Sequence, residues 1–292
     1  MTKTLLVLGS ANADLVVEVG RRPAGGETVL GGDTVVLPGG KGANTAVAAA
    51  RVGASVALVG AVGNDGYGSL LRESLESSGV DSSLVRTSER PTGIAYITVT
   101  PDGENSIVVS PGANADVSPS DVDALSFDGV SVLTCSLEVP LETVIHAIDV
   151  AADAGVRTVL NLSPVAELPA ETFKQLDTLI VNEHEAAQLV SDWRHLLRLG
   201  PKTAIVTLGS RGVAVVLPAG VEEVPSIEVD EVVDTTGAGD AFAGAFSARL
   251  AEGDRVVVAA EYAVKVAALS VTKAGAQPSY PTAAEVSSLA AG

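Results

Sequence analysis

Short apolar runs alternate with longer, alanine-rich segments along most of this chain, and this alternation constrains its fold more than any other feature. The short runs predict buried strands at Leu5–Leu8, Ser55–Val59, Val130–Thr134, Arg157–Leu160, Thr178–Val181 and Ala204–Thr207. The longer segments predict helices at Gly42–Val52, Gly68–Ser77, Leu141–Ala154, Glu183–Val190, Trp193–Leu199, Ala238–Ala251 and Arg255–Thr272. Buried strands that alternate with helices form βαβ units. The sequence therefore predicts an α/β protein of three layers, whose mostly parallel sheet is covered by helices on both faces.

Two regions, Asp14–Val36 and Gly93–Ser110, depart from this alternation because they contain strand-like runs without crossover helices. These runs are Leu15–Val19, Thr34–Leu37, Ile94–Thr100 and Ser106–Val109, and the turn Pro101–Glu104 joins the last two. We expect about 14–37 and 93–110 to form a small sheet that projects from the main layers. The chain has no internal repeat and no long linker, so residues 1–292 are interpreted as one domain.

The charge and the cysteine content exclude several classes of function. Thirty-six acidic residues against eighteen Lys and Arg give a net charge of −18, which disfavours nucleic acid and anionic membranes as partners. The single cysteine, Cys135, excludes an internal disulfide and a cysteine-based zinc cluster. No apolar run is long enough to span a bilayer, and the first residues predict a buried strand rather than a signal peptide. We therefore expect a soluble, cytoplasmic protein.

The strongest candidate for a functional motif is Asp234–Gly244, in which a loop with two glycines leads directly into an apolar helix. Backbone N–H groups at such a helix start bind phosphate oxygens. Asp240 falls in the first helical turn, where a carboxylate could accept the proton of a hydroxyl that attacks a phosphoryl group. The alternative is an acidic residue that only complements the helix dipole.

A second glycine-rich motif, Pro38–Ala46, places Lys41 and Asn44 at another helix start. It is not a Walker A loop, because Gly42 follows the lysine where serine or threonine is required. The alternative is a tight turn capped by glycines. The sequence contains neither a Gly-x-Gly-x-x-Gly motif after the first strand nor a Gly-x-Ser-x-Gly elbow, which weakens dinucleotide-binding and hydrolase interpretations.

Together these motifs resemble the signatures of the ribokinase-like, PfkB-type carbohydrate kinases: Gly39–Ala46 resembles the N-terminal signature and Asp234–Gly244 the C-terminal one. Further segments match in the expected order: Gly9–Asp14, Gly63–Gly68, Thr92–Ile107, Asn182–Ala186, Thr207–Gly212 and Gly275–Ser279. The resemblance covers nearly the whole chain. It implies a ribokinase-like α/β/α fold in which the projecting sheet closes over a sugar as a lid.

The resemblance also implies roles for individual residues. It makes Asp240 the base that activates the sugar hydroxyl, beside an anion hole formed by Gly237, Ala238 and Gly239. The residues expected to bind the sugar are Asn12, Asp14, Gly39, Gly40, Lys41, Asn44 and Glu138, together with Asp240. The residues expected to bind ATP are Asn182, Glu185, Thr207, Leu208, Gly209, Ser210, Arg211, Gly212, Gly239 and Val264.

Two kinds of cation are implied as well. Asn182 and Glu185 would organise the Mg²⁺ of MgATP, largely through water. A monovalent cation, K⁺ by expectation, would bind to the side chains or carbonyls of Asp234, Thr236, Ser270, Lys273, Gly275 and Ser279.

The reaction that the resemblance implies is the phosphorylation of D-ribose by ATP. The alternatives are a kinase for another small sugar (fructose or deoxyribose), a nucleoside kinase, or a sugar sensor without catalysis. The chain has few aromatic residues to build a pocket for the base of a nucleoside, with four Phe, four Tyr and one Trp. A sensor without catalysis would not need Asp240. The projecting sheet has apolar residues on both faces at Leu15–Val17, Val19 and Val35–Leu37, which predicts a homodimer through that sheet. The alternative is that the helices of the main layers cover its second apolar face.

Overall fold

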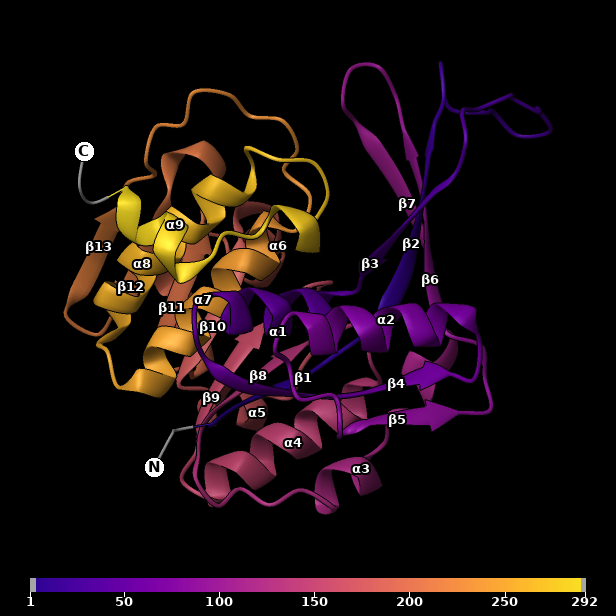
Figure 1. Cartoon of the computed structure of the whole chain (residues 1–292). Helices are drawn as coiled ribbons and strands as arrows, with labels where there is room; N and C mark the ends of the chain where they lie inside the picture. The colour runs from indigo at the N-terminus through magenta and orange to yellow at the C-terminus, as the bar shows by residue number, and fades with distance from the viewer. Residues whose placement is uncertain (1–3, 290–292) are drawn as a thin grey trace.

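A nine-stranded sheet forms the middle layer of the computed structural model, which describes residues 4–289 (Figure 1). Its strands lie in the order β13-β12-β11-β10-β9-β8-β1-β4-β5, and all neighbours from β11 to β5 are parallel. Their bounds are β1 Thr4–Leu8, β4 Ser55–Gly63, β5 Val85–Ser88, β8 Val130–Ser136, β9 Arg157–Asn161, β10 Thr178–Asn182, β11 Thr203–Thr207, β12 Val213–Leu217 and β13 Gly220–Val224. The predicted α/β fold class is therefore confirmed.

Helices cover both faces of this sheet and create two apolar cores. One face carries α1 Lys41–Arg51, α2 Gly66–Ser77, α7 Ala238–Glu252, α8 Val256–Ser270 and α9 Ala283–Ser288. The other carries α3 Pro119–Asp123, α4 Leu141–Asp153, α5 Ala170–Lys174, α6 Glu183–Leu189 and the 3₁₀ turns η1 Gly112–Asp116 and η2 Trp193–Leu199. Successive side chains of a strand point to opposite faces, so Leu5 and Val7 enter the first core while Leu6 and Leu8 enter the second.

Small residues let α1 and α7 approach closely at the centre of the first layer. A Cβ atom added to Gly244 of α7 would lie 2.3 Å from the carbonyl oxygen of Thr45 in α1. The same is true where α1 begins: a Cβ on Gly42 would lie 2.6 Å from the Cα of Gly9, at the end of β1. The first contact packs the middle of α7 against α1, and the second places the start of α1 against the carboxyl end of β1.

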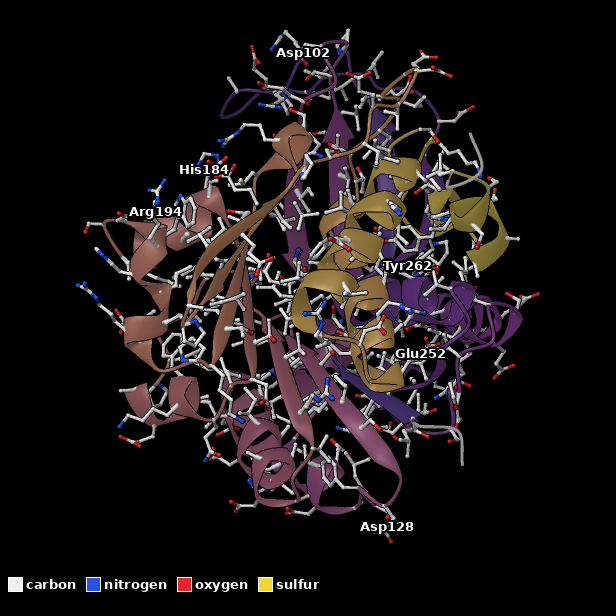
Figure 2. The ribbon with its side chains drawn as sticks, turned by 90° about the vertical axis from the view of Figure 1, so that its left-hand side faces the viewer. Asp102, Asp128, His184, Arg194, Glu252 and Tyr262 are labelled. Carbon is white, nitrogen blue, oxygen red and sulfur yellow. The ribbon has the colours of Figure 1, made fainter. Side chains whose placement is uncertain are left out.

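The projecting sheet contains β2 Asn12–Glu18, β3 Val35–Gly39, β6 Gly93–Val99 and β7 Asn105–Ser110, in the order β3-β2-β6-β7. The central pair β2–β6 is parallel and the two outer pairs are antiparallel. It rises from the layered body in Figure 1, and Figure 2 places Asp102 at its far tip. The predicted turn there is present, since the Gly103 N–H donates to the carbonyl oxygen of Thr100 at 2.8 Å.

Some elements differ from the sequence prediction. Trp193–Leu199 is a 3₁₀ helix rather than an α-helix. The strands β5, β12 and β13 and the helices α3, α5 and α9 were not predicted. In the part of the chain from Thr4 to Leu289, no helix combines the length and the apolarity that crossing a bilayer requires.

Candidate active site

The candidate site lies where the parallel strands end. Strand β4 pairs with one side of β1, and the later strand β8 pairs with its other side. The connections therefore change direction between β1 and β8, which makes this position a topological switch point. Open α/β sheets bind ligands in the crevice outside the strand ends at such a point. Both predicted glycine-rich motifs begin helices at this edge, α1 at Lys41 and α7 at Ala238.

Asp14 and Glu138 form the acidic part of the predicted sugar site. Glu138 Oε2 accepts hydrogen bonds from Ser10 Oγ at 2.5 Å and from the Lys41 N–H at 3.1 Å, so this carboxylate joins the segment after β8 to the start of α1. Asp14 lies on β2 opposite Leu37 of β3. Burial raises the pKa of Asp14 to about 7, and the charges of Glu138 and Asp240 add to this effect.

The glycines of the second motif make room for these groups. A Cβ on Gly39 would lie 2.0 Å from Asp14 Oδ2, so any side chain at that position would displace the carboxylate. Gly40 has φ 90°, a left-handed conformation that favours glycine, and a Cβ there would meet the backbone of Asn12 at 2.7 Å. Both positions therefore require glycine for steric reasons, and their contact with a sugar stays a prediction.

Asp240 is buried in the first turn of α7. Its Oδ2 accepts a hydrogen bond from Asn44 Nδ2 at 3.0 Å, so the two motifs meet directly. Burial raises the pKa of Asp240 above its ordinary value, while Lys41 and the hydrogen bond from Asn44 act in the opposite direction. The pKa of Lys41 is raised as well, chiefly by the negative charge of Asp240.

The loop before α7 differs in one detail from the expected anion hole. The Ala238 N–H already donates to the carbonyl oxygen of Thr235 at 3.2 Å. Gly237 has φ 74°, and its carbonyl oxygen accepts a hydrogen bond from Tyr280 Oη at 3.1 Å. Gly237 and Gly239 line the cavity that holds Asp240, whereas Ala238 lines the neighbouring one.

Two adjoining cavities meet at this point. The smaller, about 140 Å³, is lined by Lys41, Asp240, Asn182 and Glu185 among others, and the larger measures about 600 Å³. Thr207 and Gly239 line both. The smaller cavity therefore connects Asp240 with a space that is large enough for a nucleotide.

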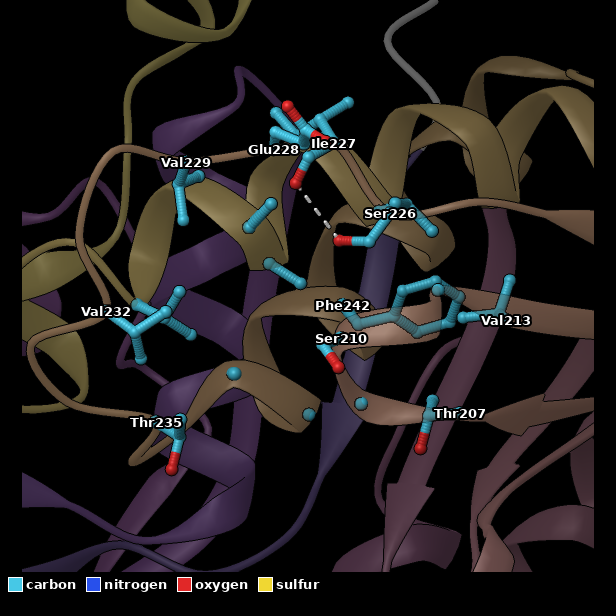
Figure 3. Close-up of a pocket in the computed structure, with 18 residues that line it drawn as sticks. Thr207, Ser210, Val213, Ser226, Ile227, Glu228, Val229, Val232, Thr235 and Phe242 are labelled. Carbon is cyan, nitrogen blue, oxygen red and sulfur yellow. Dashed lines mark hydrogen bonds between the residues drawn. The ribbon is translucent and has the colours of Figure 1, made fainter. Parts of the chain in front are cut away.

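The larger cavity has mostly apolar walls. Figure 3 shows Val229 and Val232 at one side and Val213 and Phe242 at the other. Of the residues predicted to bind ATP, Thr207, Gly209, Ser210, Gly212, Gly239 and Val264 line it. Leu208 instead packs against the second core, and the Arg211 guanidinium pairs with Glu183.

Asn182 and Glu185 cap the start of α6. Asn182 Oδ1 accepts from the Glu185 N–H at 2.8 Å, and Glu185 Oε2 accepts from the Asn182 N–H at 2.7 Å. This capping box fixes both side chains at the wall of the smaller cavity. One carboxylate and one amide suit a magnesium ion whose remaining ligands are phosphate oxygens and water.

Asp234 accepts hydrogen bonds from both segments of the predicted monovalent-cation site. Its Oδ1 accepts from the Thr236 N–H at 2.9 Å and its Oδ2 from the Gly275 N–H at 2.8 Å. Burial acts to raise the pKa of Asp234, but these hydrogen bonds outweigh it and the pKa is lowered. The ammonium group of Lys273 pairs with Glu285 at 3.1 Å, so only its carbonyl remains as a ligand. Ser270 and Ser279 are buried beside these segments.

Several residues of the site could not be predicted from the sequence. Asn114 is buried at the base of the projecting sheet, where its Nδ2 donates to Asn12 Oδ1 at 2.7 Å and its Oδ1 accepts from the Ala11 N–H at 2.9 Å. Tyr280 donates a hydrogen bond to the carbonyl oxygen of Gly237, as described above. The wall residues Ile227, Val229 and Val232 come from a loop whose only sequence signal is apolar residues among acidic ones.

Known proteins resemble this chain over nearly its whole length. The family described as "pfkB family carbohydrate kinase" matches residues 2–283. The ribokinase of Bacillus subtilis is 41% identical over 294 residues, covering 98% of this chain and 99% of that protein. The crystal structure of ribokinase from Thermotoga maritima matches with a TM-score of 0.91 and 33% identity, covering 99% of this chain and 100% of the other. The ribokinase of Arabidopsis thaliana, complexed with ribose and ATP, matches with a TM-score of 0.90 and 32% identity over 99% of each chain.

Proposed function

The chain belongs to the pfkB family of carbohydrate kinases, and we propose that it is an ATP-dependent ribokinase that phosphorylates the 5-hydroxyl of D-ribose. The observation that carries this proposal is the position of Asp240. It lies between the acidic cluster of Asp14 and Glu138 and a cavity that can hold a nucleotide.

In the proposed reaction Asp240 accepts the proton of the sugar hydroxyl while that oxygen bonds to the γ-phosphorus of ATP and the bond to the bridging oxygen breaks, releasing ADP. The amides of Gly237 and Gly239 would stabilise the negative charge on the transferred group. Lys41 would stabilise the same charge from the start of α1. Mg²⁺, organised by Asn182 and Glu185, would neutralise charge on the phosphates.

A panel of acceptors with ATP tests this proposal through the release of ADP. D-Ribose should give the highest kcat/KM, followed by 2-deoxyribose and fructose, with nucleosides lowest. A higher kcat/KM for a nucleoside would contradict the proposal and favour nucleoside phosphorylation. Absence of ADP release with every acceptor, from protein that binds ribose, would favour a sugar sensor.

We further propose that K⁺ binds between Asp234 and the Gly275–Ser279 loop and activates the enzyme. Asp234 and Gly275 are already hydrogen-bonded, and an ion there would hold the Gly237–Gly239 loop through Thr236. Replacing choline by K⁺ should increase kcat several-fold and raise the melting temperature of the wild type, because an ion that binds only the folded state stabilises it. Asp234→Asn should lose both responses. A wild type that is equally active and equally stable in both buffers would contradict the site.

The projecting sheet is also proposed to act as a lid and to form a homodimer. Its strands leave large apolar side chains in contact with solvent, with Val108 67%, Ile107 51% and Val36 38% exposed. A second copy would cover these groups and the open edges of β3 and β7. Within residues 4–289, Ile107 and Val108 stay more than half exposed, while Val36 lies beside α2 at a shared cavity.

Light scattering tests the dimer. The wild type should have the mass of a dimer at micromolar concentration, and the double variant Val17→Glu and Val36→Glu that of a monomer. Val221, which is 38% exposed on the edge strand β13, provides the matched control, since Val221→Glu should leave the mass unchanged. A monomeric wild type would refute the dimer.

A further inference from the structure

A chain of side-chain hydrogen bonds connects α2 with Asp240. Ser74 Oγ donates to Gln277 Oε1 at 2.8 Å, and Gln277 Nε2 donates to Asn44 Oδ1 at 3.0 Å. Asn44 Nδ2 then donates to Asp240 Oδ2 at 3.0 Å. Gln277 and Asn44 are both buried, so water does not compete for these bonds.

Chemistry fixes the direction of this chain. Asp240 must be ionised to accept a proton, and an ionised carboxylate only accepts hydrogen bonds. Asn44 must therefore present its NH₂ group to Asp240, which leaves its Oδ1 on the opposite side in need of a donor. Gln277 supplies that donor, and its own Oε1 is satisfied by the Ser74 hydroxyl. Reversing either amide would place two acceptors together in a buried site, which is unfavourable.

We propose that Gln277 is a positioning residue for the reaction, which holds the Asn44 amide in the orientation that stabilises the ionised form of Asp240. This inference rests on the proposed role of Asp240 as the base. Gln277 belongs to the Gly275–Ser279 loop, but its side chain contacts Asn44 and Ser74, so the inference does not depend on an ion in that loop.

The charged groups that act on Asp240 come from α1, β2, α6 and the loop after β8. Lys41 at the start of α1 favours the ionised form, while Glu138, Glu185 and Asp14 disfavour it. If these groups stay unchanged, weakening the hydrogen bond from Asn44 removes stabilisation of the charged form alone. The pKa of Asp240 should then rise, and the acid limb of the kcat profile, measured at saturating ribose so that the ionisation of Asp14 does not act through ribose affinity, should move to higher pH.

Gln277→Met tests the inference because methionine has a similar length and no amide. We expect the acid limb of kcat, measured at saturating ribose, to move by about one pH unit to higher pH, while kcat on the alkaline side stays nearly unchanged. Ser74→Ala should move the acid limb in the same direction by less. Because the groups act in series, the double variant should be no more impaired than Gln277→Met alone. The matched control is Gln175→Met, since Gln175 donates to Asp149 at 3.2 Å outside the site, and its profile should equal that of the wild type.

The possible outcomes separate this inference from the proposed function. An equal loss at every pH, or an unmoved acid limb in a variant with a normal melting curve, would overturn the role of Gln277. If Gln277→Met does not fold, the profile of Ser74→Ala decides in the same way. Asp240→Asn is measured in parallel. Retained turnover there would refute the base, whereas an inactive Asp240→Asn beside a normal Gln277→Met would refute only the positioning role.

Discussion

Asp240→Asn is expected to abolish turnover while sugar and ATP binding stay nearly intact. The amide keeps the shape of the side chain and can still interact with Asn44, but it cannot accept the proton of the attacking hydroxyl. General acid–base catalysis contributes about 10²–10⁴-fold, so the loss should appear in kcat rather than in KM. Steady-state kinetics with ribose and ATP, combined with titration calorimetry for each ligand, measures both effects.

The fold should tolerate this substitution. Burial raises the pKa of Asp240, so the cost of burying its charge exceeds the attraction to Lys41 and the hydrogen bond from Asn44, and replacing the carboxylate by an amide removes a net cost at neutral pH. Asp128→Asn is the control, because Asp128 is exposed at the end of the molecule opposite the projecting sheet (Figure 2). A variant of Asp240 that keeps more than about a tenth of the wild-type kcat would contradict its role as the base.

The layered fold could be predicted because buried strands and amphipathic helices leave different periodicities in the sequence. Leu5–Leu8 is apolar throughout, which a strand requires when both of its faces are covered, and the structure places alternate residues of this strand in the two cores. The projecting sheet could be predicted for the opposite reason, because its strands lack crossover helices. Strand β13 was missed because Val221–Glu223 are exposed at the sheet edge and carry no apolar pattern, whereas β12 was missed although it is apolar throughout and mostly buried.

The candidate site could be predicted only where it depends on local sequence. Glycines at two helix starts indicate anion binding, and the structure brings both helix starts to the same edge of the sheet. Asn114 and Gln277 could not be found in this way, because each acts through a contact more than a hundred residues away in the chain. Their single polar side chains have no local pattern, and only the packing of η1 and η4 (Gln277–Ser279) against the site gives them a role.

Asp14→Asn should weaken ribose binding and at the same time stabilise the protein without ligand. Hydrogen bonds to a charged group contribute about 1.5–3 kcal/mol, so the loss of charged acceptors should reduce affinity by about 10–100-fold. The wild-type affinity should rise between pH 6 and pH 8 as Asp14 ionises, because its pKa is about 7. The affinity of the variant should stay constant over this range. Calorimetric titration at several pH values measures both trends.

The expected change in stability follows from the direction of the same pKa shift. The pKa of Asp14 is about 7 in the folded protein against 3.8 for an unperturbed aspartate. As the pH rises from 3.8 to 7, the unfolded chain releases this proton more readily than the folded protein, so the contribution of Asp14 to stability falls and is least favourable above pH 7. Asp14→Asn removes this cost. It should raise the melting temperature by a few degrees at pH 8 and by less at pH 5.

Asp65 provides the opposite case within the same chain. It caps α2 by accepting from the Gly68 N–H at 2.8 Å, and its other oxygen accepts from the Thr92 N–H at 2.8 Å. Burial acts to raise the pKa of Asp65, but these hydrogen bonds and the Thr92 hydroxyl outweigh it, so its pKa is lowered. Asp65→Asn should therefore lower the melting temperature at pH 8 and leave ribose affinity unchanged. If Asp14→Asn also lowered the melting temperature at pH 8, the Asp14 carboxylate would stabilise the fold. That result would contradict the expectation that this carboxylate reduces stability and serves sugar binding.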